Sequence, residues 1–212
     1  MTNHPAALLS HLLEVISMAP VAAVDADGIN QPLRGLLRAG GGGDMVGLAS
    51  IPAGHVSRRS IEPMVDTCGA VPLLSCWTEG RGIIPPEILD VAVRRLQHRW
   101  PTMVLNLPHT CLPETIAMGI SLATHVVLVT DAHHANLSWL YQRGHQLSAA
   151  AHEGRVTVLA VGAAVEHGGP ETVGMPSSLH PDVGDYGFRL PTDAPALAAY
   201  YRLLERIYAP RS

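Results

Sequence analysis

The sequence predicts an α/β domain with a mostly parallel sheet and helices on both faces. Short apolar runs alternate with longer segments of helical spacing along most of the chain, which is the pattern of strand–helix–strand units. The short runs are apolar at nearly every position, as expected of parallel strands buried on both faces. A chain of 212 residues, of which 47% are hydrophobic, suffices for one sizeable core. We therefore expect a single domain over residues 1–212.

The elements of the first half follow from leucine spacing, apolar runs and breaker residues. Residues 6–17 carry leucines at helical spacing and predict a helix, and residues 33–38 predict a shorter one. Strands are predicted at residues 21–25, 48–51 and 70–76, and residues 60–68 are predicted to be helical. The glycine run 40–43 ends the short helix.

The second half continues the alternation. Pro85 and Pro86 open a helix whose apolar stripe is Ile88, Leu89, Ala92, Val93, Leu96 and Trp100. Strands at 103–107, 125–130 and 156–161 alternate with helices at 113–123 and 136–151, the second of which Gly144 weakens. A long loop rich in glycine and proline follows at 166–185, and then a last strand at 186–190. Asp193 is a good cap for the final helix, whose predicted apolar face is Leu197, Tyr200, Tyr201, Leu204 and Tyr208.

Charge composition limits the chemistry of the chain. It contains no lysine, which excludes a phosphate-loop lysine, a Schiff-base lysine and a lysine general base from this chain. The net charge is −4 and no basic run occurs, so we do not expect nucleic acid as a partner. The alternative is a basic patch assembled in the fold from Arg58, Arg59, Arg94, Arg95 and Arg99. Only 15% of residues are charged, which fits either a large buried core or a surface that a protein partner covers.

Cysteine and histidine usage points away from a metalloprotein or a disulfide scaffold. Three cysteines without a C-x-x-C motif argue against disulfides and thiolate zinc, and neither a signal peptide nor a membrane-length apolar run occurs, so we expect a cytoplasmic protein. No H-E-x-x-H motif exists among the 12 histidines. Candidates at the expected ligand edge are His109, His133 and His134 for a metal, and Cys111 with His109 as a nucleophile pair.

The ends of the predicted strands carry the polar residues of greatest interest. Ligands of open parallel sheets bind beyond the carboxyl ends of the strands. Asp25 and Asp27 follow the first strand, Asn106 ends another, and Asp131 ends a third. The two early acids have a second interpretation, because acids after a strand often cap a helix or a turn.

Taken together, these segments resemble the MinD/ParA ATPase family. The motif V-D-A-D at Val24 to Asp27 resembles the family's corresponding segment, and R-W-P-T-M-V-L-N-L-P, ending at Pro108, resembles its strand ending in D-x-P. Residues 123–130 resemble the family strand A-D-x-V-L-L-V-T, and L-P-T-D, ending at Asp193, resembles its late L-P-x-D. The resemblance implies a P-loop NTPase-like fold, and nucleotide-edge remnants at Asp25, Asp27, Asn106, Pro108, Asp131 and Asp193.

Departures from the family pattern imply a degenerate member. The loop K-G-G-x-G-K-[ST] is absent, and the sequence begins where the following helix is expected. Asn106 stands where the family's Walker B strand has the aspartate that helps to hold Mg²⁺, and neutral Asn suits a hard dication poorly. The run Gly40 to Gly43, followed by Asp44, lacks the Lys-Ser/Thr of a phosphate loop and is better explained as a turn. We therefore expect no cofactor.

A missing P-loop strand leaves its neighbours' backbone groups to be satisfied in another way. The neighbours pair directly, or residues 48–51 fill the gap, or the natural chain has more residues upstream; these alternatives stay open at this point. We expect a catalytically inactive, MinD/ParA-like binding or scaffold module that forms a homodimer or a hetero-assembly through the strand-end face. Division, partitioning, secretion and pilus machineries are the partners that the resemblance suggests. The alternatives are an ATPase switch that binds ATP and Mg²⁺ with a P-loop supplied upstream or by a partner, and a small-molecule enzyme on a Rossmann-like sheet.

Overall fold

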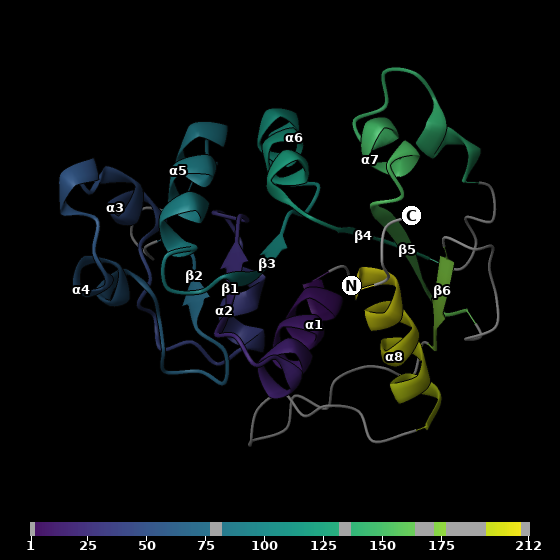
Figure 1. Ribbon diagram of the computed structural model, residues 1–212, viewed down its shortest axis with the longest axis horizontal. Coiled ribbons are helices and arrows are strands. Elements are labelled where there is room, and N and C mark those ends of the chain that lie inside the picture. Colours follow the sequence, from purple (N-terminus) through teal and green to yellow (C-terminus); the bar gives the residue numbers. More distant parts are fainter. Residues whose placement is uncertain (1–2, 77–81, 132–136, 164–171, 177–193, 209–212) are drawn as a thin grey trace. The chain divides into compact units, whose positions relative to one another are not determined.

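The computed structural model describes residues 3–76, 82–131, 137–163, 172–176 and 194–208 (Figure 1). The chain divides into two compact units. The first unit is Met1–Ser121 with Asp182–Leu190, and the second is Leu122–Pro181 with Pro191–Ser212. The single domain over residues 1–212 stays a prediction.

The first unit contains a parallel sheet of three strands in the order β2-β1-β3. Strand β1 is Val21–Asp25, β2 is Leu73–Leu74 and β3 is Thr102–Asn106. All five residues of β1 are buried, as the unbroken apolar run predicted. In the register of β1 with β3, Asp25 lies opposite Asn106. The carboxyl ends of β1 and β3 therefore meet at one edge of this sheet.

Helices flank this sheet (Figure 1). They are α1 Asn3–Ile16, α2 Pro32–Leu36, α3 Met45–Ser50, α4 Arg58–Ile61, α5 Pro86–Leu96 and α6 Pro113–Leu122, with short 3₁₀ turns η1 Ala53–His55 and η2 Glu62–Met64. Most of the predicted stripe of α5 is confirmed, because Leu89, Ala92, Val93 and Leu96 are buried, whereas Ile88 is half-buried.

The strand predicted at residues 48–51 is wrong, because residues 48–50 belong to helix α3 and Ile51 is its C-cap. Asp44 is the N-cap of α3, and its carboxylate accepts a hydrogen bond of 2.7 Å from the Gly47 amide. At the other end, Arg95 Nη1 donates to the Leu48 carbonyl at 2.6 Å. Caps at both ends outweigh a short apolar run, so residues 48–51 supply no strand to the sheet.

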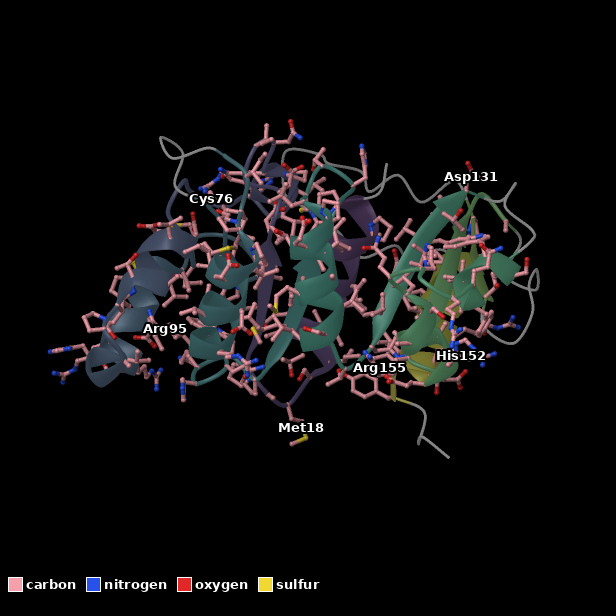
Figure 2. The ribbon with its side chains drawn as sticks, turned by 90° about the horizontal axis from the view of Figure 1, so that it is seen from above. Met18, Cys76, Arg95, Asp131, His152 and Arg155 are labelled. Atoms are coloured by element: carbon pink, nitrogen blue, oxygen red, sulfur yellow. The ribbon has the colours of Figure 1, made fainter. Side chains whose placement is uncertain are left out.

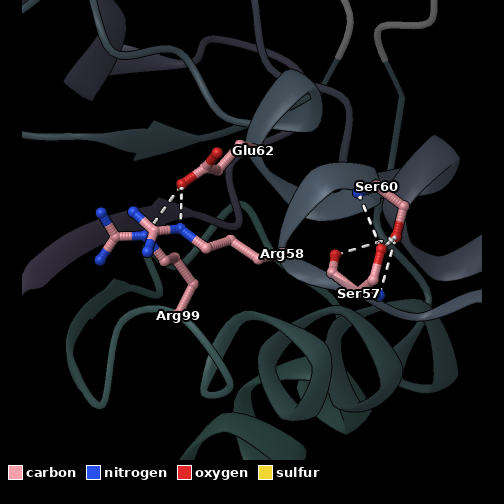
Figure 3. A network of polar contacts seen from close by, with 5 residues as sticks. All are labelled: Ser57, Arg58, Ser60, Glu62 and Arg99. Carbon is pink, nitrogen blue, oxygen red and sulfur yellow. Dashed lines mark hydrogen bonds and ion pairs between the residues drawn. The ribbon is translucent and has the colours of Figure 1, made fainter.

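A polar network holds the segment around α4 (Figure 3). Ser57 and Ser60 form a reciprocal capping box at the start of α4. Glu62 Oε1 accepts hydrogen bonds from Arg58 Nε at 2.7 Å and from Arg99 Nε at 3.1 Å. Two arginines of the suggested basic patch thus share one carboxylate.

The second unit contains another parallel three-stranded sheet, in the order β4-β5-β6. Strand β4 is Val126–Asp131, β5 is Val156–Val161 and β6 is Thr172–Met175. Strands β4 and β5 confirm the prediction. Strand β6 was missed, because it lies inside the stretch 166–185 that was predicted to be a loop, whereas the strand predicted at 186–190 lies outside the described residues.

Helices of the second unit differ from the prediction in two places. The helix predicted at 136–151 is reduced to the 3₁₀ turn η4 Ser138–Tyr141 and to α7 Ser148–His152. Gly144 lies between them with φ +89°, a left-handed conformation that interrupts a helix. Helix α8, Ala194–Tyr208, buries Tyr200 together with Ala196, Ala199 and Leu203. Leu197, Tyr201 and Tyr208, predicted for the same apolar face, are instead exposed.

No described helix combines the length and the apolar composition needed to cross a bilayer.

Candidate functional site

Asp25 and Asn106 form the centre of the candidate site in the first unit. The parallel register of β1 and β3 places them side by side, and both are buried, with exposed fractions of 0% and 5%. Asn106 Nδ2 donates a hydrogen bond of 3.0 Å to Asp25 Oδ1. An amide thus donates to Asp25 at the position where the resemblance implied an aspartate.

The remaining contacts of Asp25 hold the loop that follows β1. Its Oδ2 accepts from the Leu33 amide at 2.9 Å, and its Oδ1 also accepts from the Asp27 amide at 3.2 Å. Burial raises the pKa of Asp25, even though the hydrogen bonds from Asn106 and from these two amides act to lower it. Both carboxylate oxygens are engaged within the chain, as the capping interpretation of this acid requires.

Asp27 anchors the same loop one step further along the chain. Its Oδ1 accepts from the amides of Ile29 at 3.2 Å and Asn30 at 2.9 Å, and the Asn30 side chain donates to Oδ2 at 3.1 Å. Burial acts to raise the pKa of Asp27, but hydrogen bonds from the Asn30 backbone and side chain and from the Thr110 side chain outweigh it, so the pKa is lowered. Asp27 is a charged turn residue that is only 4% exposed.

The glycine run holds an internal anion. Asp66 is 3% exposed, and its Oδ2 accepts from the Gly42 amide at 2.9 Å while its Oδ1 accepts from the Cys68 amide at 2.9 Å. The amides of Gly40 and Gly41 also hydrogen-bond to this carboxylate. Burial alone raises its pKa, but these amides together lower it. Successive backbone N–H groups form an anion-binding nest, and here Asp66 fills it.

Arg34 connects this glycine run to the sheet. Its Nη1 donates to the Gly42 carbonyl at 2.9 Å, and its Nη2 donates to Ser75 Oγ at 2.6 Å and to the Cys76 carbonyl at 2.8 Å. Its Nε donates to Gln31 Oε1 at 2.9 Å. Sequence reasoning missed both Arg34 and Asp66, because their partners are distant in the sequence. Asp66 lies far along the chain from the glycines that bind it, and Arg34 lies far from Ser75 and Cys76.

The cysteines near this edge are protonated at neutral pH. Cys111 Sγ donates to the Ala26 carbonyl at 3.3 Å, and burial, aided by Asp27 and Asp25, raises its pKa to about 12. Burial also raises the pKa of Cys76, which Figure 2 labels, to about 11. A nucleophilic cysteine needs a lowered pKa, so the suggested pair of Cys111 with His109 lacks an activated thiolate.

The other predicted site residues are distributed as follows. Pro108 is buried and His109 is exposed, both just beyond β3. Asp131 ends β4 in the second unit and is exposed (Figure 2). His133, His134 and Asp193 lie outside the described residues. Among the residues that are described, no group of three or more His, Cys, Asp or Glu side chains is arranged to hold a metal ion.

Comparison with solved structures places this geometry in a known fold. The crystal structure of a ParA family ATPase from Chlorobium tepidum TLS aligns with 76% of this chain, over 68% of its own length, at a TM-score of 0.56. The chain has a ParA-like α/β fold. The two sequences are 16% identical, so the likeness shows the fold and not the activity. No protein-family model matches the chain, and no curated protein matches its sequence.

A ParA-like fold agrees with the parallel strands and flanking helices that the sequence predicted. Within that fold, the bond between Asn106 and Asp25 and the filling of the glycine run by Asp66 are properties of this chain.

Proposed function

We propose that this chain is a ParA-like pseudo-ATPase that serves as a protein-binding or scaffold module. The observation that carries the proposal is the 3.0 Å hydrogen bond from Asn106 Nδ2 to Asp25 Oδ1. A hard dication needs free oxygen ligands, whereas both oxygens of Asp25 already accept hydrogen bonds and Asn106 turns its amide nitrogen toward them. Magnesium therefore does not fit this pair of residues.

The chain also lacks the groups that would bind the phosphates of a nucleotide. Phosphates are bound by backbone N–H groups together with a cationic side chain, usually lysine. The chain has no lysine, and the nest at Gly40 to Gly42 is filled by Asp66. We accordingly propose that no nucleotide cofactor is used, that the chain is cytoplasmic, and that it acts through protein contacts at the strand-end face.

Isothermal titration calorimetry of Mg-ATP into the full chain tests the proposal. We expect no saturable binding at low micromolar concentration, for the wild type and for Asp25→Asn alike. Saturable binding to the wild type that Asp25→Asn abolishes would mean that this edge is a working nucleotide site, and the proposal would fail.

A second candidate is a nucleotide-dependent switch whose phosphate loop comes from upstream residues or from a partner. It is favoured by the fact that β3 and β4 each pair with a single strand within the described residues. Sequencing the genomic region before Met1 decides this candidate. An in-frame K-G-G-x-G-K-[ST] motif there would make it the better explanation. The small-molecule enzyme stays a prediction that no observation on the described residues favours.

A further inference from the structure

One carboxylate of the first unit brings Arg58 and Arg99 together (Figure 3). Arg58 is the first residue of α4, and Arg99 lies just beyond the end of α5. Both guanidinium groups donate through Nε to the same oxygen, Glu62 Oε1, Arg58 at 2.7 Å and Arg99 at 3.1 Å. Two helices that are distant in the sequence thus hold two positive groups close to each other. We call Arg58, Arg99 and the neighbouring Arg59 the arginine cluster.

The contacts with Glu62 use only the Nε atoms of the two arginines. No described residue hydrogen-bonds to the Nη atoms of Arg58 or Arg99. The Nη1 and Nη2 groups of a guanidinium form a planar fork that matches the two oxygens of a carboxylate or a phosphate. The Arg58 side chain is 67% exposed and the Arg99 side chain is 27% exposed. Each of these arginines therefore retains a fork that can bind an anion.

Arg99 is already ordered before any ligand binds. Its Cζ lies 5.1 Å from the centroid of the Trp100 ring, and Trp100 is only 4% exposed, so a buried ring supports the guanidinium. The hydrogen bonds from Arg58 and Arg99 lower the pKa of Glu62, which keeps the carboxylate that holds both arginines ionised at neutral pH. Exposed ion pairs of this kind stabilise a fold only slightly. Ordered side chains do, however, lose less conformational entropy when a ligand binds.

The arginine cluster lies in a positively charged part of an acidic chain. Residues 58–62 and 94–99 contain five arginines and a single carboxylate, whereas the whole chain has a net charge of −4. Asp90 pairs with only one of these arginines, Arg94. Because α5 runs back along the sheet before β3 begins, its last turn lies at the amino edge of the strands. The cluster is therefore separate from the strand-end face, where Asp25 and Asn106 meet.

We propose that the arginine cluster binds an acidic segment of a protein partner. The aspartate and glutamate side chains of such a segment present the paired oxygens that the free forks of Arg58 and Arg99 match. A nucleic acid is a poorer fit, because its phosphates continue beyond the cluster and meet a molecule that is negatively charged elsewhere. A short acidic segment can end within the cluster. This inference goes beyond the proposed function, which concerns the strand-end face, and it does not depend on whether the chain binds Mg-ATP.

Fluorescence polarisation of a fluorescein-labelled octaglutamate peptide tests the proposal on the full chain. We expect saturable binding at low salt that weakens as salt is added, since exposed charges are screened. The double variant Arg58→Gln, Arg99→Gln should weaken binding at least about tenfold, because two charge-assisted contacts are lost. The matched control is Arg143→Gln with Arg206→Gln, which makes the same change in charge at two exposed arginines of the second unit. It should change the affinity by less than about twofold, because these arginines do not contact the peptide.

A single substitution keeps the proposal testable if the double variant does not fold. Arg59 is exposed, and its side chain forms no hydrogen bond or ion pair with a described residue, so Arg59→Gln should leave the fold intact. We expect Arg59→Gln to weaken peptide binding about threefold, as is typical of one exposed charge, and Arg143→Gln to have no such effect.

A single-stranded oligodeoxythymidine of eight nucleotides separates the two classes of anionic partner. We expect it to bind more weakly than octaglutamate. Tighter binding of the oligonucleotide that the double variant Arg58→Gln, Arg99→Gln abolishes would identify a nucleic-acid site and overturn the proposal. The absence of saturable peptide binding, or an equal loss of affinity in the control with Arg143→Gln and Arg206→Gln, would overturn it as well.

Discussion

At the scale of single residues, the identity of residue 106 determines the charge of the candidate site. As asparagine, it donates to Asp25 at 3.0 Å and adds no charge. As aspartate, it would set two carboxylates side by side in a buried position, and such a pair must share a proton or bind a cation. The Asn106 amide therefore supplies a hydrogen bond to Asp25, and neither a shared proton nor a bound cation is needed.

The first prediction concerns Asn106→Asp. We expect a loss of about 3 kcal/mol in the free energy of unfolding at neutral pH without divalent cations, because a buried charge is left unpaired. Millimolar Mg²⁺ or Ca²⁺ should recover part of the loss, whereas neither should affect the wild type. Urea unfolding with and without the cation measures both effects. Unchanged stability of the variant in chelator would contradict the described contact.

The second prediction concerns Asp66→Ala. The substitution removes a buried carboxylate and leaves the amides of Gly42 and Cys68 without their acceptor. Hydrogen bonds to charged groups contribute about 1.5–3 kcal/mol each, so we expect a loss of at least about 3 kcal/mol at pH 7. Asp90→Ala is the control, because Asp90 forms only a partly exposed ion pair with Arg94 and should change stability by less than about 1 kcal/mol.

The pH dependence of the same variant follows from the lowered pKa of Asp66. A carboxyl whose pKa is lower in the folded state stabilises the protein above its unfolded pKa, and this contribution disappears as the pH falls through the folded value. The difference in unfolding free energy between wild type and Asp66→Ala should therefore shrink as the pH falls below about 4. A difference that stays constant or grows on acidification would show that the carboxylate does not ionise in the nest.

At the scale of elements, the packing of α5 fixes one side of the first unit. Leu89 is 0% exposed on the buried face of this helix, whereas Ile83, just before it, is 54% exposed. We predict that Leu89→Ala lowers the free energy of unfolding by about 2–5 kcal/mol, because it leaves a cavity. Ile83→Ala should cost less than about 0.5 kcal/mol. Equal losses in thermal or urea unfolding would mean that α5 does not pack as described.

The elements that the sequence predicted well are those whose signals are local and repeated. Strands β1, β4 and β5 are continuous apolar runs, and α5 carries a full apolar stripe after a proline pair. Helix α3 was missed because its two caps come from outside the apolar run, and one of them, Arg95, is distant in the sequence. Strand β6, T-V-G-M, is too short and too rich in glycine to stand out from its loop.

The same distinction applies to the candidate site. The meeting of Asp25 with Asn106 was predictable, because the ends of parallel strands lie at one edge. The nest around Asp66 was not, since a glycine run does not reveal whether its anion is a ligand or a side chain from elsewhere in the chain. The roles assigned to Asp25 and Asn106 in function stay predictions until the calorimetry is done.

At the scale of the whole molecule, the chain joins two compact units that each carry a three-stranded parallel sheet. The likeness to the structure of a ParA family ATPase extends over 76% of the chain. At 16% identity the likeness gives the fold, and the calorimetry proposed above is the measurement that addresses the activity.

The cysteines of the first unit allow a dye to be attached to the protein at one defined position. Cys68 is exposed, whereas burial raises the thiol pKa of Cys76 to about 11 and that of Cys111 to about 12. Maleimides react with the thiolate, so at pH 7 we predict that a fluorescent maleimide modifies the wild type at one site and leaves Cys68→Ser unmodified. Intact-mass spectrometry counts the dyes, and labelling of Cys68→Ser would refute the assignment. The unaltered sequence thus provides a unique attachment point for a fluorophore, and adding one engineered cysteine to the second unit is all that energy transfer between the units requires.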